Sequence, residues 1–274
     1  MSDNPTEVES AFIALPDHRL LAITGADALK FTQAQFMNDV TTLADGGWQW
    51  NGWLNAKGRV IALFALLRLD AETLWLVLPD FPPSELAGTL KRYVFRSKVK
   101  LEPRDELQVS GRLYAGAIGC RAFQGDAANA LRLDWPDQRE LRIGPAVATG
   151  NAPALARWRA ADLRAGLPRL NDSQREKWTP QQLSLDRLDA YSVKKGCYPG
   201  QEIVARTHFL GQAKRGPRLL QTASAVATGD TVTTGERGIG EVVSTAGTLA
   251  LAVLPLECDE SALRIGEQAV EVLV

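Results

Sequence analysis

The last 64 residues of the chain, from Gly211 onward, differ in composition from the rest, because they contain eight glycines and eight valines but no Phe, Tyr or Trp. Their apolar runs are short and closely spaced, as in Thr231–Thr233, Gly240–Val243 and Leu249–Leu254. Short β-branched runs separated by glycine turns are typical of small β-barrels and sandwiches. We therefore predict a C-terminal β-barrel domain over residues 211–274.

The first 210 residues mix strand and helix patterns rather than alternating them strictly. Apolar runs between turn residues predict strands at 20–23, 48–55, 60–69 and 74–78, with shorter pieces at 107–109, 113–118 and 141–143. Helical spacing and helix-start residues predict helices at 26–40, 82–95, 154–164 and 179–191. In the first helix, the spacing of Leu29, Phe36 and Val40 predicts the buried face. These patterns predict an α+β fold for residues 1–210, with two interleaved subdomains.

Charge and cysteine usage narrow the classes of function. The chain carries 31 Lys and Arg against 32 Asp and Glu, and this balance argues against a protein that binds nucleic acid through its overall charge. The three cysteines, Cys120, Cys197 and Cys258, are odd in number and form no close pairs, which fits a reducing compartment rather than a disulfide framework. With only His18 and His208 besides, we expect no metal site. The apolar runs are too short to span a membrane and the polar start lacks a signal-peptide pattern, so we expect a cytoplasmic protein.

One stretch, from Lys194 to Arg206, indicates chemistry. Tyr198-Pro199-Gly200-Gln201 has Pro and Gly at the central positions of a type II turn, which would place Cys197 at an exposed corner. A helix starting at Gln201 would carry Glu202 in its first turn and pair it with Arg206 four residues later. Lys194, Lys195 and the helix N-terminus would favour the thiolate form of Cys197. The alternative is a buried cysteine that only fills space.

The same stretch resembles the signature of a known family. Lys195-Gly-Cys-Tyr-x-Gly-Gln-Glu-x-x-x-Arg206 is similar to the signature of the YgfZ proteins, folate-binding relatives of the glycine-cleavage aminomethyltransferase (T-protein) that act in iron–sulfur cluster maintenance. Weaker similarities lie at 25–40, at 54–59 and around Trp158, Gly166 and Pro168. The resemblance spans nearly the whole chain and implies a T-protein-like fold, with α+β parts around a folate-sized cleft and a small barrel.

The resemblance also implies a cofactor, partners and site residues. The cofactor would be tetrahydrofolate or a derivative, and the partners would be iron–sulfur proteins or their assembly factors. Cys197 would be the working residue, with Lys195 beside it. We expect folate to be bound near Trp53, Asn55 and Arg59 and near Gln201, Glu202 and Arg206 of the signature helix. The T-protein pattern continues into two aspartates where this chain has Ala62 and Leu63, so we expect no aminomethyl transfer.

Three functions remain open at this point. The first is a folate-binding accessory factor for iron–sulfur cluster assembly or repair that supports tRNA modification indirectly. The second is a tetrahydrofolate-dependent one-carbon transferase, so whether the protein is an enzyme stays undecided. The third is a protein that binds RNA directly, which the near-neutral charge disfavours.

Two further clusters have both ordinary and functional explanations. An aromatic group, Trp48, Trp50 and Trp53, would pack in the core or stack on a pterin ring. Five cations within 91–100 would complement a helix end on a solvated face, or would attract a folate tail or an RNA backbone. They are Lys91, Arg92, Arg96, Lys98 and Lys100.

Overall fold

The computed structural model describes residues 11–113, 121–211 and 213–273, so Cys120 and most of the expected strand at 113–118 lie outside the described residues. The chain forms two compact units that alternate along the sequence. The first comprises the described residues of 1–35, 39–51 and 64–158, and the second those of 36–38, 52–63 and 159–274. A separate domain starting at residue 211 stays a prediction.

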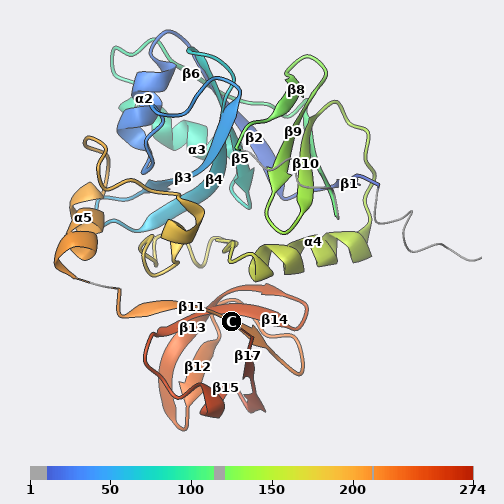
Figure 1. Ribbon diagram of the computed structural model, residues 1–274, viewed down its shortest axis with the longest axis vertical. Helices are drawn as coiled ribbons and strands as arrows, with labels where there is room; N and C mark the ends of the chain where they lie inside the picture. The colour runs from blue at the N-terminus through green and yellow to red at the C-terminus, as the bar shows by residue number, and fades with distance from the viewer. Residues whose placement is uncertain (1–10, 114–120, 212, 274) are drawn as a thin grey trace, which may run out of the picture. The chain divides into compact units, whose positions relative to one another are not determined.

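The predicted meander is confirmed in a five-stranded antiparallel sheet (Figure 1). Its strands, in spatial order, are β3 Gly47–Leu54, β4 Val60–Arg68, β5 Thr73–Pro79, β2 His18–Thr24 and β6 Lys100–Pro103. Nearly all residues of β4 and β5 are buried, as expected for uninterrupted apolar runs covered on both faces. After β5, Pro82 precedes helix α3, Pro83–Leu90, which continues into a 3-10 helix at Lys91–Tyr93.

The first helix is shorter than its periodicity predicts. Helix α2 covers Ala28–Gln35, and it buries Phe31, whereas Leu29 is only half-buried. The predicted continuation to Val40 is wrong, because Phe36 forms an antiparallel bridge with Trp53 and the next residue donates its N–H to the Gly52 carbonyl at 2.9 Å. Strand-like pairing of this segment therefore ends the helix.

A second five-stranded sheet belongs to the first unit. Its strands, in spatial order, are β1 Ile13–Ala14, β7 Gln108–Arg112, β10 Arg139–Gly144, β9 Ala130–Trp135 and β8 Gln124–Asp126. The core beside it is aromatic: the ring of Trp135 lies 4.8 Å from that of Trp50 and 6.0 Å from that of Trp48. Trp48 and Trp50 are buried, so they are core residues.

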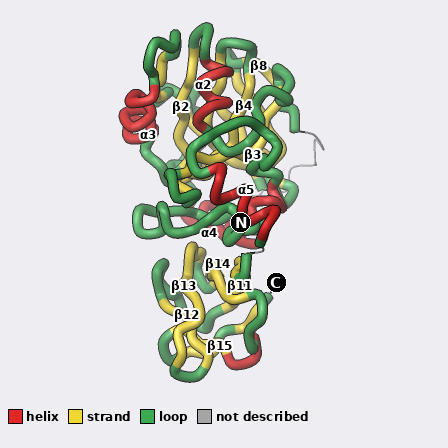
Figure 2. Tube along the Cα trace, turned by 90° about the vertical axis from the view of Figure 1, so that its left-hand side faces the viewer, coloured by secondary structure: helices red, strands yellow, loops and turns green. Residues whose placement is uncertain are grey.

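The C-terminal region forms the predicted barrel. The seven antiparallel strands, in spatial order, are β16 Gln268–Ala269, β15 Leu263–Ile265, β12 Thr231–Thr234, β13 Arg237–Ala246, β14 Leu249–Pro255, β11 Arg215–Gln221 and β17 Glu271–Val272. A short 3-10 helix, Glu260–Ala262, precedes β15. The strands curve around a common interior (Figure 2), which small aliphatic side chains such as Val232, Val242 and Leu254 fill. Because these side chains are small, the interior needs no aromatic residue.

Along the chain between β10 and β11, one predicted helix is confirmed and another is wrong. Helix α4 covers Ala152–Arg164 and ends before Gly166, which has a φ of +70°. The helix expected at 179–191 is instead a series of turns with a 3-10 helix at Leu185–Leu188. Ser184 and Asp189, on either side of it, have left-handed φ values of 48° and 51°, which a continuous α-helix excludes.

Candidate functional site

The signature stretch folds into the predicted turn and helix. Gly200 has φ 78° and ψ 0°, and the Gln201 N–H donates to the Tyr198 carbonyl at 3.1 Å, which are the features of a type II turn. Helix α5, Gln201–Leu210, begins directly after the turn. The turn leaves Cys197 exposed, whereas the next residue, Tyr198, is buried. The prediction of an exposed thiol is confirmed.

A second tight turn joins β3 to β4 within the same unit. The Gly58 N–H donates to the Asn55 carbonyl at 2.9 Å, and the side-chain oxygen of Asn55 accepts from the N–H groups of Lys57 and Arg59 at 2.9 and 3.0 Å. An Asn that bonds its own following backbone in this way stabilises a turn. Gly58 has a φ of +66°, which favours glycine.

The two turns pack backbone against backbone through their glycines. A Cβ atom on Gly200 would lie 2.5 Å from the Asn55 carbonyl oxygen and 2.7 Å from the Gly58 Cα. A Cβ atom on Gly58 would lie 2.9 Å from the Cβ of Ile203 in α5. The structure therefore brings the two predicted site segments together, and the contact requires glycine on both sides.

Lys195 holds the signature loop in place. Its side chain is 5% exposed, and the ammonium donates to the carbonyls of Phe36 at 2.6 Å and Asn38 at 3.0 Å. It also lies 5.0 Å from the centre of the Tyr198 ring. The neighbouring Lys194 is exposed. The ammonium of Lys195 thus has a structural role through these bonds.

Most of the expected folate-binding side chains already have protein partners. Arg59 donates to the Lys177 carbonyl at 2.8 Å and to the Gln182 side chain at 2.9 Å. The Gln201 amide donates to the Lys195 carbonyl at 3.0 Å. Trp53 is 3% exposed. Because these side chains are bonded to the protein or buried, a ligand at the two turns would also have to contact groups other than those predicted.

The ion pair expected between Glu202 and Arg206 is absent from the described part of the chain, where both side chains are exposed. An exposed pair at this spacing contributes only about 0.3–0.5 kcal/mol, which does not offset the entropy of ordering two long side chains. Both groups are consequently available to a ligand or partner.

Glu176 is a candidate that sequence reasoning missed. It has a left-handed φ of 61°, which is uncommon for a non-glycine residue, and its N–H donates to the Val60 carbonyl at 2.8 Å. Its exposed carboxylate accepts a hydrogen bond from the Asn55 amide at 2.8 Å. Nothing in the polar run around Glu176 indicates this placement, because it follows from pairing with the start of β4.

A charged cluster joins this segment to the barrel inside the same unit. Glu241 of β13 accepts from Lys177 at 2.6 Å and from Gln174 at 2.7 Å. Burial acts to raise the pKa of Glu241, but the two hydrogen bonds together with the charge of Lys177 outweigh it and hold the pKa below its usual range.

The two described cysteines differ in setting. Cys197 is exposed, whereas Cys258 is partly buried, and burial together with the nearby charge of Glu260 raises the pKa of the Cys258 thiol. Within residues 11–113, 121–211 and 213–273, no group of three or more His, Cys, Asp and Glu side chains could hold a metal ion. Across the same residues, no helix is long and apolar enough to cross a membrane.

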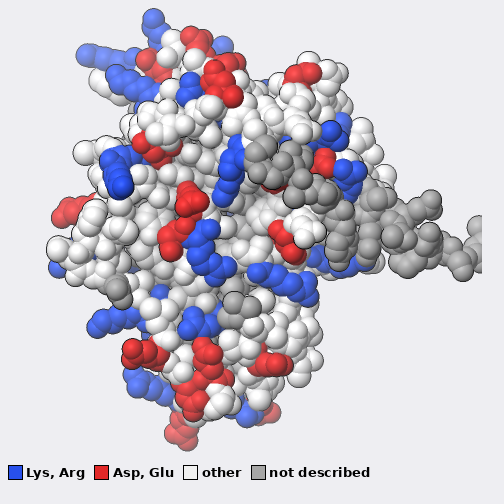
Figure 3. All heavy atoms as spheres, in the orientation of Figure 1, with Lys and Arg blue, Asp and Glu red and all other residues white. Residues whose placement is uncertain are grey.

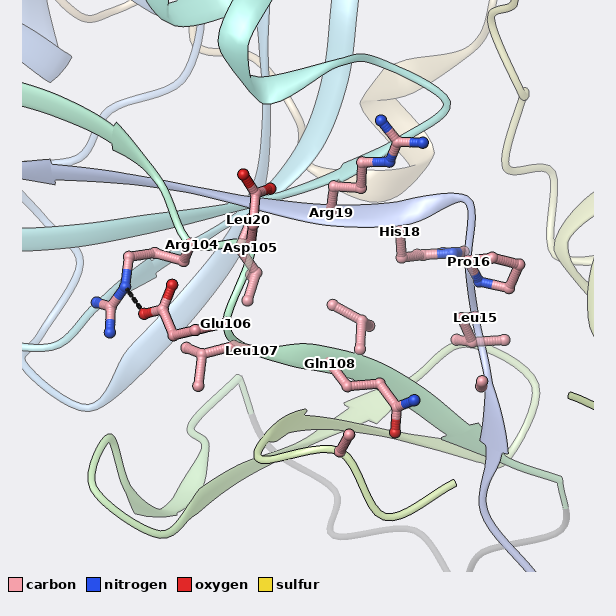
Figure 4. A pocket seen from close by; sticks show the side chains of 13 residues that line it. Leu15, Pro16, His18, Arg19, Leu20, Arg104, Asp105, Glu106, Leu107 and Gln108 are labelled. Carbon is pink, nitrogen blue, oxygen red and sulfur yellow. Dashed lines mark hydrogen bonds and ion pairs between the residues drawn. The ribbon is translucent and has the colours of Figure 1, made fainter. Parts of the chain in front are cut away.

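The first unit has a cavity of about 410 Å³ between the starts of β2 and β7 (Figure 4). Its lining includes His18, Arg19, Gln108 and an ion pair between Arg104 and Glu106. None of the site residues predicted from the sequence lines this cavity. The site predicted from the sequence therefore does not include this cavity.

No family model matches the chain, but comparison with individual known proteins places it in a family. It is 30% identical to the tRNA-modifying protein YgfZ of Photobacterium profundum, over 94% of this chain and 88% of that protein. It is also 30% identical to the protein of the same name from Cronobacter sakazakii, over 74% of this chain and 68% of that protein. The chain belongs to the YgfZ family.

Two other similarities agree with this assignment. An uncharacterised protein of Haemophilus influenzae is 33% identical over 75% of this chain and 71% of its own length. Among solved structures, the aminomethyltransferase T of the glycine cleavage system from Bartonella henselae matches with a TM-score of 0.76. That match covers 94% of this chain and 83% of the other at 14% identity, and it shows a T-protein-like fold.

Proposed function

We propose that this protein is a YgfZ-type factor that supports tRNA modification through the thiol of Cys197, with a reduced folate as ligand and iron–sulfur proteins as partners. The observation that carries the proposal is the exposed Cys197 on a type II turn braced by the Asn55–Arg59 turn. A rigid turn presents the thiol in one orientation, which a residue acting on a partner protein requires.

The chemistry of an exposed thiol limits what Cys197 can do. It can exchange with a disulfide of a partner, or it can act as one ligand of an iron–sulfur cluster. The described residues offer no set of three metal-binding side chains, so a partner would supply the remaining ligands. Both modes place the partner directly over the Cys197 turn.

The site has groups that suit a reduced folate. A pterin ring presents several N–H donors, and the exposed carboxylate of Glu176, oriented by Asn55, is a fixed acceptor for such donors. The exposed cations Lys57 and Arg206 lie on the segments that carry the two turns and suit the anionic tail of a folate. When bound, a reduced folate would supply a one-carbon carrier.

The test replaces Cys197 by Ser in a strain whose own copy of the gene is deleted. We expect Cys197→Ser to lower the level of thiolated tRNA bases to that of the deletion strain, while the purified variant binds tetrahydrofolate as the wild type does. Cys258→Ser is the matched control and should restore modification fully. Full activity of Cys197→Ser would refute the role of the thiol, and absence of tetrahydrofolate binding to the wild type would refute the folate ligand.

One-carbon transfer is the second candidate, and the T-protein-like fold favours it. The positions expected to hold two aspartates are Ala62 and Leu63, both buried in β4, and neither side chain can position a proton. Loss of a positioned acid or base typically lowers a rate by about 10²- to 10⁴-fold. Turnover in a glycine-cleavage assay within tenfold of an authentic T-protein would favour this candidate instead.

A further inference from the structure

The segment Lys91–Lys100 combines exposed cations with exposed aromatic rings. All five of its Lys and Arg side chains are exposed, and the segment contains no Asp or Glu. Phe95 is 77% exposed and Tyr93 is 49% exposed. An exposed phenyl ring normally gains by burial, so a ring held in solvent among cations indicates a surface that something else covers.

The backbone of this segment is fastened at several points within the first unit. The Lys98 N–H donates to the Asp27 carboxylate at 2.7 Å, and the Asp27 N–H donates to the Lys98 carbonyl at 3.3 Å. The Lys98 carbonyl oxygen also lies where a Cβ atom on Gly25 would be, at 2.2 Å, so glycine is required there. The rings are therefore presented by a fixed loop, which lowers the entropy cost of binding.

The geometry around Phe95 suits stacking. The Arg96 guanidinium lies 5.1 Å from the centre of the Phe95 ring, and Arg96 has a left-handed φ of 56°. A cation over one face of a ring that is 77% exposed leaves the rest of the ring for a base to stack on, with positive charge near the phosphate of that base. Figure 3 shows Lys and Arg side chains projecting at the upper left, near α2 and β6 of Figure 1, with acidic side chains among their neighbours.

We propose that this surface, Lys91–Lys100, binds an unpaired loop of a transfer RNA. The inference rests on the proposed role in tRNA modification and adds a direct contact with the RNA. Unpaired loops expose bases for stacking, whereas a duplex offers only its backbone. The net charge of the whole chain is −1, so an RNA would have to be attracted by a local cluster of exposed cations such as Lys91–Lys100 and not by the overall charge of the protein.

The experiment measures binding of a fluorescent RNA stem-loop, and of a duplex of equal length, to the full chain at several salt concentrations. We expect the stem-loop to bind more tightly than the duplex. Phe95→Ala should weaken stem-loop binding about tenfold or more, because the variant loses the stacking of one base on the ring. Each phosphate contact with a single strand contributes about 0.7 to the steepness of log K against log salt. Replacing Arg92, Lys98 and Lys100 by Gln should therefore make this dependence less steep by about 2.

Matched controls lie in the second unit. Phe209→Ala removes a ring that is 66% exposed, and a triple Gln variant removes three exposed cations, Arg164, Lys214 and Arg237. We expect both controls to bind the stem-loop as the wild type does. Absence of stem-loop binding, equal affinity for the duplex, or equal losses in the controls would overturn the proposal. Unchanged stem-loop binding by Phe95→Ala would overturn it too.

The two proposals fail separately. Cys197→Ser should bind the stem-loop normally even though it loses tRNA modification in cells. If Phe95→Ala binds normally while Cys197→Ser still abolishes modification, the RNA surface is wrong and the proposed function stands. If Cys197→Ser leaves modification intact while Phe95→Ala loses RNA binding, the proposed role of the thiol is wrong and the RNA surface stands.

Discussion

Replacing Gly200 by Ala should destabilise the protein by about 2–5 kcal/mol, in two separable parts. The left-handed backbone, with φ of 78°, costs a non-glycine residue about 1–2 kcal/mol. The new Cβ would also lie 2.5 Å from the Asn55 carbonyl oxygen and 2.7 Å from the Gly58 Cα, and these are backbone atoms that cannot rotate away. Such overpacking adds about 1–3 kcal/mol.

Gly235 is the matched control, because its φ is +59° but a Cβ atom added there would meet no other atom within 4 Å. Gly235→Ala should therefore carry only the backbone cost of about 1–2 kcal/mol. A second control is Gly196, next to Cys197, where a Cβ also meets nothing within 4 Å. Gly196→Ala should leave stability almost unchanged.

The assay is urea unfolding followed by tryptophan fluorescence, with the free energy of unfolding extrapolated to water for each variant. Gly200→Ala should fall below Gly235→Ala by the steric part, about 1–3 kcal/mol. Equal losses in the two variants would refute the close contact between the turns. A loss in Gly196→Ala as large as that in Gly200→Ala would show that the whole loop, rather than this contact, is sensitive.

Three further outcomes are expected. Lys195→Met should destabilise by about 2–3 kcal/mol in urea unfolding, since it leaves two carbonyls without their charged donor, whereas Lys194→Met should change little. Cys197 should react with iodoacetamide faster than Cys258 at neutral pH, because Cys258 is partly buried and its thiol has a raised pKa. Mass spectrometry of each labelled peptide measures the two rates, and equal rates would contradict this expectation. Because the pKa of Glu241 is lowered in the folded state, its stabilisation is present above its unfolded pKa of about 4.3 and is lost as pH falls through the folded value. Glu241→Gln should therefore flatten the loss of stability below about pH 4.3, and an unchanged acid profile would exclude this role.

Local patterns were sufficient where the residues themselves restrict the backbone. Pro199 and Gly200 allow few turn types, and the structure has the type II turn and the helix start at Gln201 that they predict. The barrel could likewise be predicted from the sequence, because short valine-rich runs between glycine turns favour short antiparallel strands over helices. The apolar runs at 60–69 and 74–78 became the central strands β4 and β5 for the same reason.

Patterns failed where a distant segment supplied the backbone partners. The periodicity at 26–40 could not show that Phe36 would bridge Trp53. The helix-start residues Thr179 and Pro180, on which the helix predicted at 179–191 rested, could not show the left-handed backbone at Ser184. The charges of Glu202 and Arg206 at helical spacing indicated a pair that the exposed helix does not form. In each case a weak local preference was outweighed by tertiary contacts or by solvent.

The sequence by itself determined the exposed Cys197 on its turn, the mixed α+β region and the aromatic-free barrel, because proline, glycine and β-branched residues act through their own backbone preferences. The tertiary structure alone decided that Gly58 meets Gly200, that the Lys195 ammonium is buried against main-chain carbonyls, and that Asn55 orients Glu176. These contacts join residues more than a hundred positions apart, and their geometry depends on how the strands pair, which no local pattern records.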